Sequence, residues 1–329
     1  MQVALNILLF LAGFSIATFL ALRPKKARED VERLTSNLRH YSDGFIQNLS
    51  KKEQSCGEEG LVVSNEATNL LTKEQIEEMY DMNAWQRTVY EEFKTTILAK
   101  GKGFNTFPCI YATMGYRSGD HRYVFLHSDD PSEPRNIRLI GPALKSYLRL
   151  SRSLGPNTSL VIMGAPTEGE QRTVEEYNHN FWEMLRGLRI WDAVPWPADV
   201  PQDTESAKWA FCFDGEPLFP VALTPAHQKR WSRHAPVPLV ALQPKWVLDN
   251  LLSTPEKRAS ATGKVRTLLA QYDQTEISPD LTQYGEVGTS EVHQLCLRDE
   301  NTTVECPYGD FDKGGPSPAS SRRASREYE

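Results

Sequence analysis

The sequence lacks the short motifs by which several enzyme classes are recognised. It contains no GxxxxGK[ST] phosphate-binding loop, no HExxH zinc motif, no GxSxG serine motif and no GxGxxG after its first strand. These absences argue against P-loop phosphoryl transfer, zinc proteolysis, serine hydrolysis and a purely dinucleotide-binding fold. There is also no aspartate-rich calcium loop and no repeat of fixed period.

Long runs of one charge and paired cysteines are also missing. The 329 residues carry a formal net charge of -6, with both signs interspersed, which argues against nucleic acid as a partner. The five cysteines are odd in number, widely spaced and without a CxxC pair. That pattern is typical of a reducing compartment, and not of a disulfide framework or a structural zinc site.

The N-terminus is the clearest regional feature. Residues 1–22 contain no charged side chain, and about 20 apolar residues span the core of a bilayer. The next six residues, RPKKAR, hold four cations, which by the positive-inside rule keep the following chain on the cytosolic side. We therefore expect a single-pass N-terminal transmembrane helix with a cytosolic-facing domain; a signal peptide and a buried helix are the alternatives.

Composition shifts divide the rest of the chain. The expected regions are the anchor at 1–22, a polar stalk at 23–71, a catalytic domain at 72–309 and a disordered tail at 310–329. Within the domain, helical and strand-like patterns are mixed without strict alternation. This predicts the α+β class, as a single mixed α/β domain preceded by the anchor.

Periodicity predicts the elements of this domain. Trp85, Val89, Phe93 and Ile97 recur every four residues, which indicates an amphipathic helix after a capping box at Thr72. Two apolar runs joined by a turn, 107–116 and 121–128, are typical of strands. Further helices are expected at 136–154, 173–191, from 245 and at 263–273, and further strands at 159–165, 208–214, 216–224 and 238–244.

Histidine and cationic side chains gather after one of these strands, in TPAHQKRWSRH. Thr224, followed by proline, is a good N-cap, so a short helix is expected to start there. In its first turn His227, Arg230 and Trp231 would share one face. A neutral imidazole is a common haem ligand, and guanidinium groups bind carboxylates. A packing histidine on a solvated basic face is the alternative interpretation.

Three further residues are candidates for chemistry. Cys109 opens an apolar segment and could be a thiolate ligand of haem or a buried structural thiol. Asp214 and Glu216 flank a glycine at the start of an apolar strand. A desolvated carboxylate is a suitable partner for a cationic substrate.

The order of these segments resembles the YqcI/YcgG family. The resemblance covers roughly residues 85–308 and is carried by FPCIYA, WPADVPQD, WAFCFDGEPLFPVALTPAHQKRWSRHAP, LQPKWVLD, GKVRTLLAQYD, SPDLTQYG and ECPY. Members of that family with an assigned activity are haem-dependent N-oxygenases, among them an arginine N-hydroxylase of cycloserine biosynthesis and the pre-guanitoxin N-hydroxylase.

The resemblance implies a haem-dependent monooxygenase that hydroxylates a guanidine or amine nitrogen of a small amino-acid-derived substrate in secondary metabolism. It implies haem b, with His227 as the iron ligand and Cys109 as the alternative. Asp214 and Glu216 would pair with the cationic nitrogen of the substrate. The remaining residues expected at the cofactor or at a substrate carboxylate are Arg230, Trp231 and Arg233.

Such an enzyme would use O₂ or peroxide as its oxidant, with O₂ requiring a reductase as a partner, and its N-terminal helix would hold it at a membrane. Two other classes of function stay open at the level of sequence. One is a membrane-anchored, non-catalytic haem-binding or haem-sensing protein. The other is an anchored adaptor without a cofactor, whose tail is read by a kinase.

Overall fold

A mixed β-sheet organises the part of the chain that the structure describes. The structure is a computed structural model that describes residues 69–99, 106–282 and 290–308. In these residues the sheet has five strands in the order β1-β2-β5-β4-β3, with β1 and β2 parallel and the other neighbours antiparallel. The strands are β1 (Arg122–Phe125), β2 (Leu160–Met163), β3 (Phe211–Phe213), β4 (Glu216–Leu223) and β5 (Leu239–Pro244).

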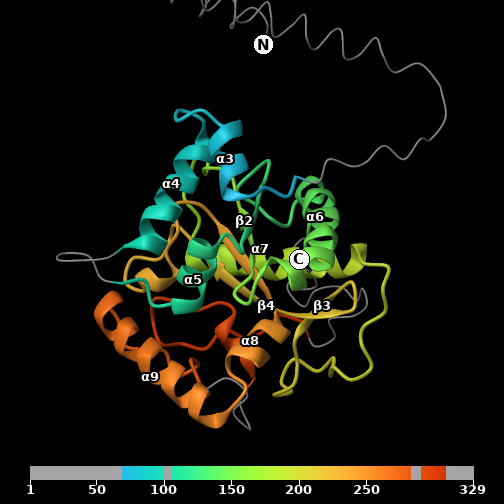
Figure 1. The fold of residues 1–329 in the computed structure, drawn as a ribbon, viewed down its shortest axis with the longest axis vertical. Helices are drawn as coiled ribbons and strands as arrows, with labels where there is room; N and C mark the ends of the chain where they lie inside the picture. Colours follow the sequence, from blue (N-terminus) through green and yellow to red (C-terminus); the bar gives the residue numbers. More distant parts are fainter. Residues whose placement is uncertain (1–68, 100–105, 283–289, 309–329) are drawn as a thin grey trace, which may run out of the picture. The chain divides into compact units, whose positions relative to one another are not determined.

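Helices surround this sheet, with α4, α5 and α9 on one side of the view in Figure 1 and α6 on the other. The α-helices are α3 (Lys73–Met79), α4 (Trp85–Leu98), α5 (Ile110–Ser118), α6 (Pro134–Leu154), α7 (Val174–Trp191), α8 (Lys245–Leu251) and α9 (Pro255–Tyr272). Two short 3-10 helices are η1 (Trp231–Arg233) and η2 (Glu291–Gln294). The parallel strands β1 and β2 are joined through α6, because a parallel pair needs a long crossover connection.

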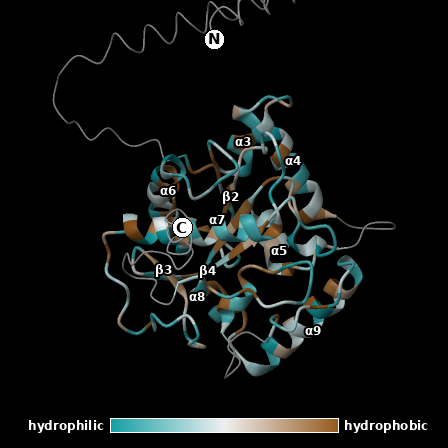
Figure 2. Cartoon of the chain, turned by 180° about the vertical axis from the view of Figure 1, so that it is seen from behind, coloured by the Kyte–Doolittle hydropathy of each residue, from teal (hydrophilic) through white to brown (hydrophobic). Residues whose placement is uncertain are grey.

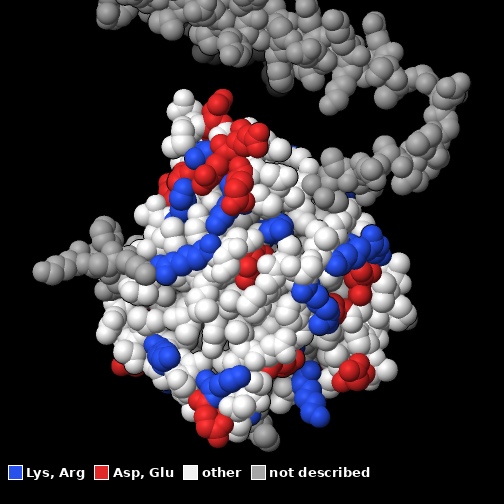
Figure 3. Space-filling model, viewed as in Figure 1, with Lys and Arg blue, Asp and Glu red and all other residues white. Residues whose placement is uncertain are grey.

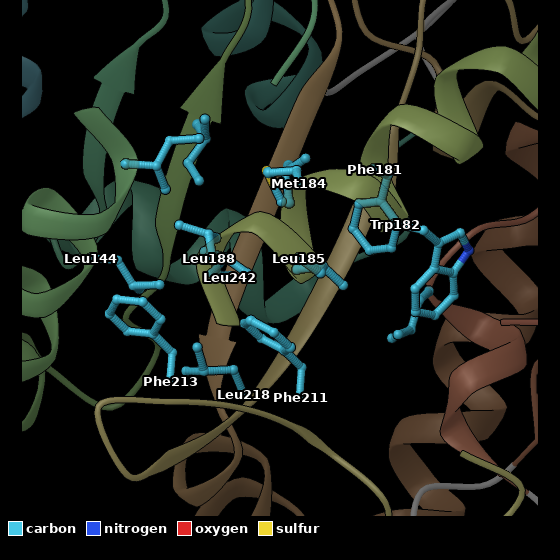
Figure 4. Packing of buried hydrophobic residues seen from close by; sticks show 14 of the residues in the cluster. Leu144, Phe181, Trp182, Met184, Leu185, Leu188, Phe211, Phe213, Leu218 and Leu242 are labelled. Carbon is cyan, nitrogen blue, oxygen red and sulfur yellow. The ribbon is translucent and has the colours of Figure 1, made fainter. Parts of the chain in front are cut away.

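Because side chains alternate along the strands, the two faces of the sheet contribute to two different hydrophobic clusters. In β4, Leu218 and Ala222 are buried on one face, whereas Phe219, Val221 and Leu223 are only partly buried on the other. The buried face packs against α6 and α7, whose side chains point toward the strands in Figure 4. The other face contributes to a cluster with residues of α4 and α5. Figure 2 shows the apolar residues along the central strands between these layers.

The predicted mixed α/β domain is confirmed, and so are most of its elements. The helices at 136–154 and 173–191 appear as α6 and α7, and the pair at 208–224 appears as β3 and β4. The capping box at Thr72 is present at the start of α3. Apolar periodicity thus identified α4, α6 and α7. The helix expected at 263–273 is α9, which begins earlier than predicted, at Pro255.

Two local predictions are wrong. The segment 107–116 does not form a strand, because α5 begins at Ile110 and ends at Gly119 in the left-handed conformation with φ 77°. A short apolar run fits a buried helix as well as a strand, so periodicity alone could not decide. The chain after Thr224 forms turns followed by η1, not an α-helix, although the Thr224 hydroxyl still accepts the Ala226 N–H at 3.2 Å.

The predicted membrane anchor also has to be corrected. It was placed on residues 1–22, which lie outside the described residues. Across 69–99, 106–282 and 290–308, no helix combines the length and the apolarity that crossing a bilayer requires. The transmembrane helix, and with it the membrane location with a cytosolic-facing domain, are therefore not retained.

Candidate functional site

A cavity lies on the face of the sheet that α4 and α5 cover. The centres of water molecules could occupy about 310 Å³ of it, which places it at the lower end of the range for ligand sites. Its walls come from the partly buried face of β4 and β5, from α4, from the start of α5 and from α8 and α9. The walls are mostly apolar and include Phe93, Phe107, Phe219, Val221, Leu239 and Leu269.

Few polar side chains line this cavity. Among the described residues of the wall, Arg233 is the charged one. The wall also contains the thiol of Cys109 and the imidazole of His121. The other polar side chains of the wall are Tyr111, Ser159, Ser232, Gln243 and Gln294. Two of the residues predicted from sequence, Cys109 and Arg233, are therefore brought together here.

Cys109 immediately precedes α5 and has an exposed side chain at the cavity wall. Desolvation by the surrounding protein raises the pKa of its thiol. The backbone N–H groups of Ala112 and Tyr111 and the Arg233 guanidinium act to lower it, but more weakly. A free thiol here is thus protonated at neutral pH. A bound metal would change this, because a coordinating thiol is deprotonated.

His121 is a lining residue that sequence reasoning missed. It is 3% exposed, and neither ring nitrogen makes a hydrogen bond within the described residues. Burial lowers its pKa to about 4, against the smaller opposite effect of the nearby Asn157 backbone, so the ring is neutral at pH 7. The signal was available: this histidine stands immediately before the strand RYVF, two residues after the helix-capping Gly119.

The ring of His121 fits only because α5 has glycine at its point of contact. A Cβ atom on Gly115 would lie 2.3 Å from the Asn157 carbonyl oxygen and 2.6 Å from Nε2 of His121. Both distances are far below van der Waals contact. The imidazole is therefore wedged between α5 and the start of β2, at the wall of the cavity.

Arg233 brings a buried positive charge to the same wall. It is 8% exposed, and its guanidinium donates to the backbone carbonyls of Gln294 at 2.9 Å and of Leu295 at 3.5 Å. In the part of the chain that the structure describes, no carboxylate lies within 4.0 Å of it. Burial lowers its pKa to about 10, so it stays charged at neutral pH. The nearby Asp273 carboxylate only partly offsets this burial, and a buried charge that is partly compensated is a candidate partner for an anionic ligand.

His227, the iron ligand expected from the resemblance, has a different environment. It is 1% exposed and is not part of the cavity wall. Its Nε2 donates to the Leu297 carbonyl at 2.8 Å, so Nδ1 accepts from the Thr224 hydroxyl at 2.9 Å. Burial also lowers the pKa of this ring. In this arrangement neither nitrogen has a lone pair left for a metal.

The side chain of Arg230 is turned the same way, toward the C-terminal segment. It donates to the Arg298 carbonyl at 2.7 Å and to Oδ1 of Asn301 at 2.7 Å, and it is 1% exposed. Trp231, in contrast, is 37% exposed and packs its ring 4.9 Å from that of His234. Of the three residues expected on one helical face, His227 and Arg230 therefore both face the C-terminal segment, whereas Trp231 faces solvent.

A single carboxylate holds the backbone of this segment. Asp299 accepts the N–H groups of Gln228, Lys229 and Arg230 at 2.8, 3.1 and 2.8 Å. We call residues 224–234 and 294–301, joined by these bonds, the motif clamp. His227, Arg230 and Arg233 bond across the clamp, and Arg233 also lines the cavity.

The two carboxylates expected at the substrate lie elsewhere. Asp214 pairs with Lys145 at 3.1 Å and Glu216 with Arg152 at 3.2 Å, both on α6. Neither lines the cavity. The geometry therefore does not favour a role for them in binding a cationic nitrogen there.

Comparison with known proteins agrees with the order of these segments. The sequence matches the YqcI/YcgG family over residues 93–309. This chain belongs to the YqcI/YcgG family. It is 36% identical over 238 residues to the "Uncharacterized protein YcgG" of Bacillus subtilis (strain 168), an alignment that covers 71% of this chain and 91% of that protein.

Two further relatives of this YqcI/YcgG protein extend over a similar length. The "Uncharacterized protein YqcI" of Bacillus subtilis (strain 168) is 34% identical over 245 residues, 73% of this chain and 94% of its own. The "Putative N(omega)-hydroxy-L-arginine synthase DcsA" of Streptomyces lavendulae is 30% identical over 252 residues, 74% of this chain and 91% of its own. No solved structure matches the chain significantly.

The cavity of this YqcI/YcgG protein suits a haem better than a bare metal ion. Its described residues contain no group of three or more histidine, cysteine or acidic side chains that could hold a metal. A haem iron needs only an axial protein ligand, because the porphyrin supplies the others. Cys109 could be that ligand, Arg233 could pair with a carboxylate group, and the apolar walls suit a macrocycle. Cys109 and Arg233 thus fit a haem, whereas His227 does not.

Proposed function

We propose that this protein is an oxidoreductase that hydroxylates a nitrogen atom of a small amino-acid-derived substrate, with haem b as its cofactor. The observation that supports this most is the apolar cavity with Cys109 and Arg233 in its wall. The name of the Streptomyces relative, an N(omega)-hydroxy-L-arginine synthase, suggests the same class of reaction.

The proposal moves the iron ligand from His227 to Cys109, the alternative that the sequence had left open. Cys109 would bind the iron as a thiolate, and the N–H groups of Tyr111 and Ala112 would stabilise its negative charge. When bound, the haem would supply the activation of O₂ or peroxide and the oxygen atom that reaches the nitrogen.

The other wall residues bind and shield. Arg233 holds a carboxylate, either a haem propionate or a substrate carboxylate, and the carbonyls of Gln294 and Leu295 fix its orientation. Phe219, Val221 and the other apolar side chains keep water out of the cavity. Excluding water strengthens the polar contacts that remain and limits unproductive loss of the oxidant.

The test is the absorption spectrum of the full chain expressed with added haem, in the ferric, ferrous and ferrous-CO states. The wild type and His227→Ala should show a strongly red-shifted CO band, and Cys109→Ala should lose it. Mass spectrometry after addition of peroxide, or of O₂ with a reductase, should detect a product with one added oxygen atom. A folded protein without a haem spectrum, or a CO band that persists in Cys109→Ala, would refute the proposal as stated.

A further inference from the structure

The register of the sheet places three polar side chains of the cavity wall side by side. Gln243 of β5 lies opposite Phe219 of β4 and, on its other side, next to Ser159, which directly precedes β2. The Arg122 N–H donates to the Ser159 carbonyl at 3.0 Å, which brings His121 beside Ser159. Neighbouring strands are about 4.8 Å apart. We call His121, Ser159 and Gln243, which all line the cavity, the polar row.

The polar row and the pair of Cys109 and Arg233 lie at opposite ends of the cavity. Gln243 and Leu239 both line the wall and are four residues apart on β5, which corresponds to about 13 Å along a strand. Leu239 pairs with the last residue of β4, and the next residue, Thr224, donates its N–H to the Arg233 carbonyl at 2.9 Å. The Arg233 guanidinium in turn acts electrostatically on the Cys109 thiol.

A haem held by Cys109 would leave the polar row to the substrate. The thiolate would occupy one axial position of the iron, so the substrate has to lie on the other side of the haem, away from Cys109. The polar row lies at that end of the cavity. Arg233, beside the thiol, lies at the end where the haem would be held.

The polar row offers more free acceptors than donors. Nε2 of Gln243 donates to the Thr158 carbonyl at 3.4 Å and to Oγ of Ser159 at 3.3 Å, and within the described residues its Oε1 has no donor. The Ser159 hydroxyl thus keeps its hydrogen for a ligand. The neutral ring of His121 has one N–H, which the Asn157 carbonyl beside Nε2 can accept, and one lone pair that no described residue uses. Two acceptors and one donor suit a group with N–H bonds.

Hydrogen bonds behind the polar row fix its position. The Thr158 hydroxyl donates to the Asp120 carbonyl at 2.9 Å and lies 3.1 Å from the Tyr147 hydroxyl. The Asn157 N–H donates to the Asp120 carboxylate at 3.2 Å, and these four residues are at most 3% exposed. None of the described lining residues is acidic, and on the face in Figure 3 exposed acidic side chains gather over α3 instead. The row therefore recognises a ligand through hydrogen bonds from a fixed frame.

We propose that the polar row binds the end of the substrate that is remote from the hydroxylated nitrogen, and that this end carries an amino or amide group; the proposal rests on the proposed function. The N–H groups of this end donate to Oε1 of Gln243 and to the free ring nitrogen of His121, and the Ser159 hydroxyl donates to an acceptor beside them. The body of the substrate packs on the apolar side chains of β2, β4 and β5 between the two ends. Arg233 is then left to a haem propionate.

The experiment uses two ligands of the same shape, hexanamide and 2-heptanone, in which a methyl group replaces the NH2 group. Their dissociation constants for the full chain are measured by calorimetry, with and without haem. The ratio of the two constants isolates the N–H groups, because the apolar chain contributes equally to both. Gln243→Met keeps the size of the side chain but removes its amide, so the ratio should shift about tenfold against hexanamide. An unchanged ratio would overturn the proposal.

Two further variants assign the contact. His121→Leu also removes an acceptor and should shift the ratio in the same direction, which serves as the test if Gln243→Met does not fold. The matched control is Gln294→Met, the same change in the cavity wall at the Arg233 end, where the backbone carbonyl that orients Arg233 is kept. It should leave the ratio unchanged. A shift as large as that of Gln243→Met would place the ligand at the wrong end and overturn the proposal.

Added haem separates the two ends of the cavity. Hexanamide binding and its dependence on Gln243 should persist in the haem-loaded protein. Haem that abolishes this binding would overturn the placement, because the cofactor would then fill the polar row. The ratio shift in a protein without a haem spectrum would support the subsite and refute the haem of the proposed function. Haem-dependent hydroxylation with an unchanged ratio would keep the proposed function and refute the subsite.

Discussion

The contact between α5 and His121 gives the sharpest prediction of stability. In Gly115→Ala, the added Cβ would lie 2.3 Å from the Asn157 carbonyl oxygen and 2.6 Å from Nε2 of His121. The first of these atoms belongs to the backbone, so a simple side-chain rotation cannot relieve the clash. Overpacking of this kind costs about 1–3 kcal/mol. For a domain of this size that corresponds to a fall in Tm of roughly 2–12 °C.

A matched substitution separates the clash from the helical preference of alanine. Gly263 also lies inside a helix, α9, and is exposed; apart from its own helical turn, nothing in the described residues lies within 4 Å of the position that an added Cβ would take. Gly263→Ala should therefore stabilise the protein by about 0.5–1 kcal/mol. Calorimetric unfolding of the wild type and both variants is the assay. A Tm for Gly115→Ala equal to or above that of the wild type would refute the packing argument.

Three further predictions concern the motif clamp and α6. Burial acts to raise the pKa of Asp299, but three backbone N–H donors outweigh this effect and lower the pKa. The ionised carboxylate therefore stabilises the folded protein above pH about 4, and this stabilisation is lost as the pH falls through the pKa of the folded state. Urea unfolding should therefore show Asp299→Asn less stable than the wild type at pH 7, with a difference that shrinks below pH 4. His227→Ala leaves the buried Leu297 carbonyl without its donor and should cost about 2–4 kcal/mol while leaving the haem spectrum of the folded fraction unchanged; a lost CO band would restore His227 as the ligand. Glu216→Gln breaks an ion pair with the exposed Arg152 and should change the unfolding free energy by less than about 1 kcal/mol, so a larger loss would contradict a surface role.

The sequence predicted the elements whose signals are local. The four-residue spacing of Trp85, Val89, Phe93 and Ile97 was enough for α4, because the buried face of an amphipathic helix repeats along the chain with the helical period. The start of α5 was misread, since the apolar run after Cys109 fits either type of element and its helical state depends on packing against α4 and the sheet.

The site was less accessible to such reasoning, because the partners of its residues are far away in the chain. His227 bonds to Leu297, 70 positions later, and Arg233 to Gln294, 61 positions later. The spacing inside the motif therefore could not tell which side chains fix the fold and which reach the cavity. His121 was missed since its role depends on the approach of Gly115, a relation that only the folded helix creates.

The motif clamp also sets the order in which the site can form during synthesis. The carbonyls that orient Arg233 come from Gln294 and Leu295, and the carboxylate that holds the backbone before it comes from Asp299. A nascent chain that has emerged only as far as β5 already contains every strand of the described sheet, but Arg233 then has no fixed orientation. A ligand that depends on the orientation of Arg233 would therefore find this partner in place only after residues 294–299 have been synthesised and packed.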